Sequence, residues 1–160
     1  MEMNEKAIIF HIGQEDYGIP IKYVISIEKF ERSTTIPQLP SYVRGIVKAR
    51  GELIPVIDIS DVLYKKQLQQ DEQLRLIVLN TAELPVGILV KETKEIIDIP
   101  KESLKQIGLV AYHRTEYFSA IANLEDRLIT MIDPERFVSS LDGIKEIIKY
   151  MAEQKENANV

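Results

Sequence analysis

Short runs of β-branched and aromatic residues, separated by turn residues, recur along most of this chain. The run at residues 7–12 ends at Gly13, and a second run follows at residues 17–21, which is the pattern of a β-hairpin. The same criterion predicts further strands at residues 24–27, 42–49, 53–58, 74–79, 86–90, 95–99, 117–122 and 128–132. Because helical periodicity is nearly absent before the C-terminal part, the pattern predicts an all-β protein.

Two stretches depart from this pattern. Residues 60–63 can start a short helix with Ser60 as its cap, and the polar run at 65–73 is the best linker candidate. Near the C-terminus, Asp133 is an N-cap before a proline, and apolar residues then recur at helical spacing. We therefore predict an amphipathic C-terminal α-helix over residues 134–153, interrupted near Ser139 or Gly143. We expect this helix to pack on the neighbouring strands, with contact to a partner as the alternative.

The two halves of the chain contain a weak internal repeat. Residues 42–46 align with 117–121 at an offset of 117 − 42 = 75, and the pattern Leu-Ile-x-x-Ile-Asp ends at both Asp58 and Asp133. Residues 18–22 align with 87–91 at an offset of 87 − 18 = 69. Chance similarity is the alternative, because Ile and Val recur in any strand. A genuine repeat predicts two similar small β-barrels, approximately residues 1–73 and 74–138.

Composition limits the functions that the chain can have. Its 160 residues are 45% hydrophobic, which suits one compact unit or two small subdomains with a common core. The absence of cysteine excludes disulfides, thiolate metal sites and thiol nucleophiles. A polar N-terminus and short apolar runs predict a cytoplasmic protein without membrane insertion. The net charge of −5 disfavours non-specific binding to nucleic acid.

No set of residues has the spacing of a catalytic or metal site. His11 and His113 are the only histidines, and neither has a Ser or Asp partner at a recognisable motif spacing. Asp58 and Asp61 could imitate a carboxylate pair for a metal, but helix capping explains them better. The glycines are scattered at turns, so no phosphate-binding loop is present. We expect no enzymatic activity, cofactor or metal.

A basic row on the predicted hairpin at 42–58 is the main candidate for binding. Arg44, Lys48 and Arg50 alternate along one strand, so they should share a face unless a bulge intervenes. Arg50 and Gly51 form the predicted turn, whereas the aligned turn of the second half is acidic. A solvated turn residue is the alternative role for Arg50. Because arginine makes bidentate contacts with carboxylates, Arg50 is the strongest single candidate for a partner contact.

The segments 42–51 and 54–58 resemble the Gly-Val-Ile-Asn-Leu-Arg-Gly and Pro-Val-Val-Asp signatures of the CheW family, and the likeness extends over residues 8–138 of a single domain, 1–160. Members of this family are adaptors that couple chemoreceptors (methyl-accepting chemotaxis proteins) to the histidine kinase CheA in bacterial chemotaxis. The resemblance implies two SH3-like five-stranded β-barrels with a hydrophobic core between them. It also implies that the regulatory domain of CheA docks on a barrel face, and that the receptor tip lies in the groove between the barrels.

The resemblance also implies roles for individual residues. Arg50 matches the arginine of the family's Arg-Gly turn, which is associated with partner coupling. Ile25 and Ile27 lie in the strand that matches the contact region of the first barrel. Lys48 replaces the family's usual Asn, and Ser60 replaces an expected Arg. These departures leave open a divergent paralogue that serves another receptor–kinase pathway. A small-barrel nucleic-acid-binding protein is a further alternative.

Overall fold

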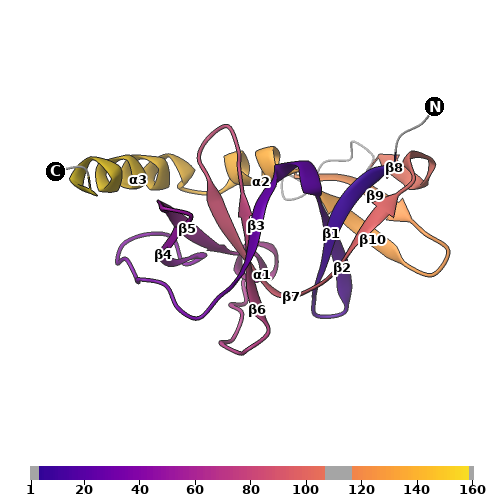
Figure 1. Cartoon of the computed structure of the whole chain (residues 1–160), viewed down its shortest axis with the longest axis horizontal. Coiled ribbons are helices and arrows are strands. Elements are labelled where there is room, and N and C mark those ends of the chain that lie inside the picture. Colours follow the sequence, from indigo (N-terminus) through magenta and orange to yellow (C-terminus); the bar gives the residue numbers. More distant parts are fainter. Residues whose placement is uncertain (1–3, 107–116, 159–160) are drawn as a thin grey trace.

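The computed structural model describes residues 4–106 and 117–158, and shows a mostly β protein with its C-terminal helix at one end (Figure 1). The strands are β1 (Glu5–Ile12), β2 (Glu15–Pro20), β3 (Val24–Lys29), β4 (Val43–Ala49), β5 (Glu52–Asp58), β6 (Leu74–Leu79), β7 (Val86–Ile99), β8 (Leu104–Gln106), β9 (Phe118–Asn123) and β10 (Leu128–Ile132). The helices are the 3-10 turns η1 (Ile21–Tyr23) and η2 (Lys101–Ser103) and the α-helices α1 (Ile59–Tyr64), α2 (Pro134–Ser140) and α3 (Ile144–Ala158). The predicted fold class is confirmed. His113 lies outside the described residues.

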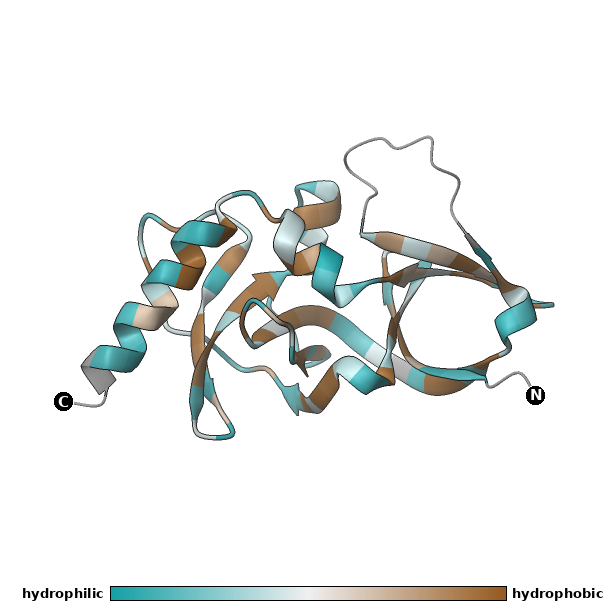
Figure 2. Cartoon of the chain, turned by 90° about the horizontal axis from the view of Figure 1, so that it is seen from above, coloured by the Kyte–Doolittle hydropathy of each residue, from teal (hydrophilic) through white to brown (hydrophobic). Residues whose placement is uncertain are grey.

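The strands form two barrels with separate interiors. Barrel one contains β3, β4, β5, β6 and the first part of β7. Barrel two contains β1, β2, the last part of β7, β9 and β10, with the short β8 beside β9; it is the ring of strands at the right of Figure 2. Leu76 and Leu89 are among the side chains that fill barrel one, and Ile9 and Ile129 are among those that fill barrel two.

Strand pairing shows that the internal repeat is real and that its two copies exchange strands. Ile27 of β3 pairs with Ile77 of β6 in barrel one, and Ile96 of β7 pairs with Ile8 of β1 in barrel two. These are equivalent pairs, because each is related to the other by the offset of 69 residues. Strands from the first copy therefore complete the barrel built mainly from the second copy, and the reverse is also true.

This exchange changes the expected subdomain boundaries. Residues 1–73 and 74–138 do not coincide with the barrels, because β1 and β2 belong to barrel two while β6 and the start of β7 belong to barrel one. The parallel pairings β5–β7 and β10–β2 close the two barrels in equivalent ways. The sequence repeat identifies similar segments, but it does not determine which segments pair.

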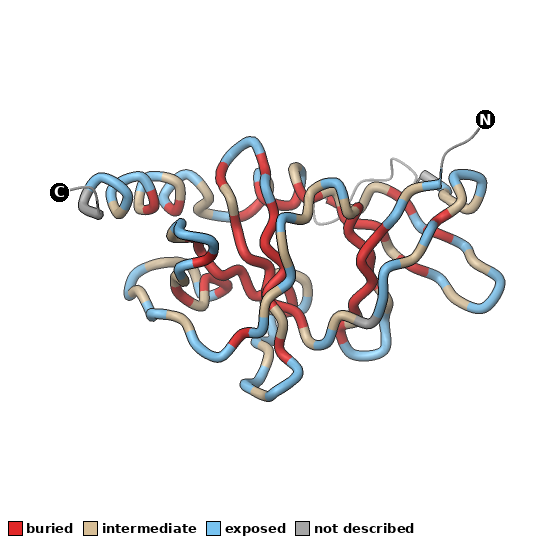
Figure 3. Tube along the Cα trace, viewed as in Figure 1, coloured by how far each residue is buried: buried red, intermediate tan, exposed pale blue. Residues whose placement is uncertain are grey.

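The largest core lies between the two barrels and joins them into one unit. Ile8, Phe10 and Ile57 are fully or almost fully buried there, together with Phe137 of α2 and Ile147 of α3. Figure 3 shows the buried parts of the chain concentrated where the two lobes meet. Burial of the large apolar side chains in this one cluster is the main force that holds the barrels together.

Aspartates cap both short helices. The backbone amide of Asp61 donates to Asp58 Oδ1 at 3.2 Å, so Asp58 caps α1. The prediction of Ser60 as the cap is wrong, because the cap lies two residues earlier, at Asp58, and Ser60 lies buried within the helix. Asp133 caps α2 as predicted, and the break before α3 occurs at residues 141–143, where Gly143 has a φ of 81°.

Candidate partner-binding site

The tip of the β4–β5 hairpin is a two-residue turn made by Arg50 and Gly51. Ala49 pairs with Glu52, and the turn residues have φ values of 51° and 83°. Positive φ at both positions defines a type I′ turn, for which Asn-Gly is the preferred sequence. A positive φ is uncommon for residues other than glycine, asparagine and aspartate. Turn geometry therefore explains Gly51, but it does not explain an arginine at position 50.

A bulge interrupts the predicted basic row. The register of β4 against β5 shifts between Val43 and Gly45, which makes Arg44 the extra residue. Arg44 Nη1 donates to Asp58 Oδ2 at 2.9 Å and to the carbonyl of Leu68 at 2.8 Å. The expectation that Arg44 shares an exposed face with Lys48 and Arg50 is wrong for this reason.

Asp58 organises this part of barrel one. Its carboxylate is fully buried and accepts hydrogen bonds from Arg44, from the Leu68 amide at 2.9 Å and from the Asp61 amide in the first turn of α1. The candidate linker is thus fixed to the barrel at Leu68. Sequence analysis found the capping role and missed the ion pair. The available signal was that Arg44 aligns with Ser119 in the repeat, so its charge belongs to one copy only.

The two other candidates, Ile25 and Ile27, project from β3 into solvent. Their side chains are 44% and 38% exposed, and β3 stands at one end of the strand order. The equivalent of Ile27 on barrel two is Ile96, which is 54% exposed and aligns with it at the offset of 69. Sequence analysis did not assign Ile96, although the alignment contained the signal. Exposed isoleucines on strands are candidates for protein contacts.

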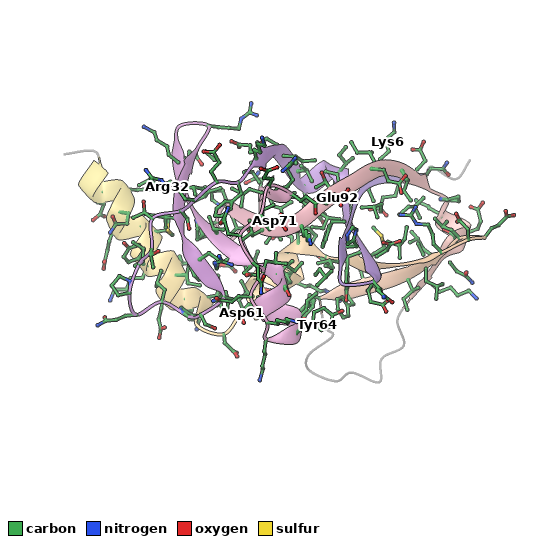
Figure 4. All side chains as sticks on the ribbon, turned by 90° about the horizontal axis from the view of Figure 1, so that it is seen from below. Lys6, Arg32, Asp61, Tyr64, Asp71 and Glu92 are labelled. Atoms are coloured by element: carbon green, nitrogen blue, oxygen red, sulfur yellow. The ribbon has the colours of Figure 1, made fainter. Side chains whose placement is uncertain are left out.

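An aromatic cleft of about 880 Å³ spans both barrels on the side of α1. Its walls include Tyr17 and Tyr64, whose hydroxyls share a hydrogen bond, and Tyr42, whose hydroxyl donates to the Asp142 carbonyl. Tyr64 and the nearby Asp61 are labelled in Figure 4. Burial raises the pKa of the Tyr17 and Tyr42 hydroxyls above the usual value, so both stay protonated at neutral pH. The cleft therefore offers neutral hydroxyls and aromatic surface.

Two searches of the described residues bear on other kinds of site. Within residues 4–106 and 117–158, no group of three His, Asp or Glu side chains could hold a metal ion. None of the helices in that part of the chain is long and apolar enough to cross a membrane. Tyr42, the one aromatic residue beside the basic row, is only 8% exposed and cannot stack on a base.

The family model of the CheW-like domain matches residues 6–142, which include both barrels and the hairpin with its Arg-Gly tip. This chain belongs to the CheW-like domain family. The Arg50–Gly51 turn, the bulge at Arg44 and the buried Asp58 therefore lie inside the matched region.

Individual relatives cover most of this CheW-like chain. It is 29% identical over 139 residues to the chemotaxis protein CheW of Klebsiella aerogenes, covering 86% of this chain and 84% of that protein. Identity to the chemotaxis protein CheW of Bacillus subtilis is 27% over 134 residues, covering 83% and 86%. The crystal structure of the scaffolding protein TtCheW from Thermoanaerobacter tengcongensis matches with a TM-score of 0.76 and 27% identity, covering 86% of this chain and 90% of that chain.

Proposed function

We propose that this chain is a non-catalytic scaffold that couples chemoreceptors to the histidine kinase CheA in bacterial chemotaxis. The single observation that carries the proposal is the CheW-like match over residues 6–142. Relatives of similar length are chemotaxis proteins, and the similar solved structure is that of a scaffolding protein. In this role the chain acts in the cytoplasm and reaches the membrane only through its receptor partner.

The proposal places the regulatory domain of CheA on barrel one. The surface offered to it carries Lys48 and Arg50 near the hairpin tip and Ile25 and Ile27 on β3, all of them exposed. Arginine is enriched among the residues that supply most of the binding energy at protein interfaces, and exposed apolar patches mark interaction sites. The helical tip of the receptor binds between the barrels in this scheme.

Substitution of Arg50 tests the kinase-facing part of the proposal. Arg50→Glu should weaken binding of a CheA regulatory domain by about tenfold, because it reverses the charge at an exposed interface position. Arg50→Asn should also weaken binding while leaving the thermal midpoint unchanged or higher, because Asn-Gly suits a type I′ turn. Isothermal titration calorimetry with the regulatory domain, and separately with a receptor tip, measures both effects.

Lys149→Glu on α3 is the matched control, since Lys149 is exposed and carries the same charge. If both Arg50 variants bind both partners as tightly as the unmodified chain, Arg50 does not belong to the site. If the unmodified chain binds neither partner, the proposed function is wrong.

A divergent paralogue for another receptor–kinase pathway is the second candidate. The observation in its favour is that Lys48, which replaces the family's usual Asn, is exposed beside the hairpin tip, so the replacement alters the surface and not the core. Under this alternative, Lys48→Asn should raise affinity for a CheA regulatory domain from a typical chemotaxis system. The same calorimetric titration measures that change.

A further inference from the structure

A groove of about 630 Å³ opens beside β4, at the end of barrel one that carries the hairpin tip. Arg32, Ser33 and Thr34 form one wall, and Lys48 and apolar side chains of β4 and β5 form the other. Figure 4 shows Arg32 at the end of the molecule opposite Lys6. Arg32 lies ahead of the predicted strand at residues 42–49, and nothing in its local sequence pattern indicated a site residue.

Three contacts hold the wall containing Arg32 in place. The backbones of Thr34 and Ile46 exchange hydrogen bonds of 3.0 and 2.9 Å, and Ser33 Oγ donates to the carbonyl of Arg44 at 2.7 Å. Gly45 has a φ of 138°, and a Cβ atom there would lie 2.2 Å from the Thr34 carbonyl oxygen. Glycine at position 45 thus permits the close approach of the two segments, and the groove is a built feature of barrel one.

The bridge brings two basic residues to the same groove. Arg32 and Lys48 each lie two residues from the Thr34–Ile46 bridge, and they line the groove from its two walls. Both are exposed, and neither forms an ion pair with a described residue. Like charges that line one groove repel each other. An anion between them would relieve this repulsion.

Barrel two shows that the fold does not require these charges. Lys105 pairs with Ile121 there, as Thr34 pairs with Ile46 in barrel one. The positions opposing each other two residues beyond that pair are Ser103 and Asn123, which are both neutral. The cationic pair is therefore specific to barrel one of a chain whose net charge is −5.

The groove also offers main-chain hydrogen-bonding groups. Ile46 and Lys48 alternate along β4, so the amide and carbonyl of Lys48 point toward the same edge as those that bond Thr34. Within the described part of the chain, the isolated bridge on this edge involves Ile46 only. An extended peptide could therefore add to the edge of β4 while its side chains enter the groove.

We propose that this groove binds carboxylate side chains of an extended acidic segment in a protein partner, with Arg32 and Lys48 as the paired cationic contacts. The inference rests on the proposed function in that it places a partner on barrel one. It adds a recognition site with a defined chemistry. Two cations that line one groove suit Asp or Glu side chains better than apolar ones.

An NMR titration of the full ¹⁵N-labelled chain tests the groove directly. The probe is the blocked peptide acetyl-Gly-Glu-Asp-Glu-Gly-amide, and the control probe replaces its acids with Gln-Asn-Gln. The acidic peptide should shift the amide signals of residues 32–34 and 46–48, and raising the salt concentration should reduce the shifts. Equal shifts with the neutral peptide, or shifts distributed without a focus at these residues, would overturn the proposal.

Paired variants separate the groove from general charge effects. Arg32→Gln/Lys48→Gln should weaken binding of the acidic peptide by about fivefold, as expected for two exposed charge contacts. Lys145→Gln/Lys149→Gln removes the same charge from exposed positions of α3 and should leave the affinity unchanged. If the Arg32→Gln/Lys48→Gln variant binds the acidic peptide as tightly as the Lys145→Gln/Lys149→Gln variant does, the groove is excluded as the binding site.

Binding of a CheA regulatory domain, measured on the same proteins, keeps the two proposals distinguishable. If the unmodified chain binds the acidic peptide in the groove but not the regulatory domain, the proposed function fails and the groove stands. If the chain binds the regulatory domain and the titration shows no focus at the groove, only the groove is excluded.

Discussion

Asp58 and Asp133 occupy the same position in the two copies of the repeat but have different surroundings. Both cap a helix, and in both copies the aspartate amide donates to a tyrosine carbonyl, of Tyr42 or Tyr117, at 2.8 Å. Asp58 is fully buried and paired with Arg44, whereas the Asp133 side chain is 28% exposed and lies 3.7 Å from the exposed Arg136. The common role is capping, and the buried ion pair is an addition to one copy.

Alanine substitution of the two aspartates should therefore have unequal costs. Asp58→Ala should lower the free energy of unfolding by about 3 kcal/mol, because it leaves Arg44 without its buried partner and also removes a cap. Asp133→Ala should cost about 1 kcal/mol, the usual value of an N-cap. Urea denaturation of both variants measures the difference, and equal losses would show that the ion pair adds nothing.

The basic residues of barrel one show which single-residue features sequence patterns can predict and which they cannot. The exposed Arg50–Gly51 tip follows from hairpin spacing and turn chemistry, both of which are local. The position of Arg44 depends on a bulge, which reverses the alternation of side chains beyond it. Gly45 within a predicted strand was the available signal, since a glycine inside a strand often marks a bulge. The cationic groove was missed because the Thr34–Ile46 bridge, which brings Arg32 close to β4, joins two segments that are separated in the sequence.

At the scale of secondary-structure elements, α3 has two parts with different environments. Ile147 and Met151 are buried in the core between the barrels, whereas most of residues 152–156 are exposed. Figure 1 shows α3 extending outward past β4 and β5. The predicted packing of the helix thus holds for its first turns.

Substitution and truncation should distinguish the two parts of α3. Ile147→Ala should lower the free energy of unfolding by about 3 kcal/mol, because it removes buried methyl groups and leaves a cavity. A chain ending after Ala152 should lose less than about 0.5 kcal/mol, since none of residues 153–156 is buried. Thermal denaturation followed by circular dichroism tests both, and a large loss on truncation would contradict this division.

The strand β7 shows where element prediction failed. Two strands were expected at residues 86–90 and 95–99, but the structure has one strand of 14 residues. Glu92, with a φ of 51°, lies near the point at which the pairing changes from β6 to β1. The polar residues between the expected strands reflect this change of partner, and local pattern cannot distinguish it from a turn.

At the scale of the whole molecule, the exchange of strands between copies makes each barrel dependent on both halves of the chain. The repeat was visible in the sequence, because equivalent positions keep similar residues. The exchange was not visible, because strand order depends on contacts between segments distant in sequence. The presence of two barrels could therefore be predicted, whereas the strands that belong to each barrel could not.

Cleavage of the chain between the exposed residues Gln69 and Gln70 should give two fragments that fold only together. Fragment 1–69 contains β3, β4 and β5 but lacks β6 and β7, and fragment 70–160 lacks β1 and β2. Each fragment alone should therefore lack a cooperative thermal transition, and mixing them should restore one near that of the intact chain. Circular dichroism and size-exclusion chromatography measure this, and a cooperative transition in fragment 1–69 alone would contradict the exchanged arrangement.

The exchange also determines the order in which the protein can fold during synthesis on the ribosome. The hairpin β1–β2 is made before the other strands, but its barrel also needs β10, which ends at Ile132. Apolar residues of this hairpin, including Ile9, must wait for most of the chain before they are covered. Long-range pairing of this kind slows folding and prolongs the exposure of aggregation-prone, unpaired strands. The hairpin β1–β2 is thus the segment whose apolar residues stay uncovered longest, until β10 has been made.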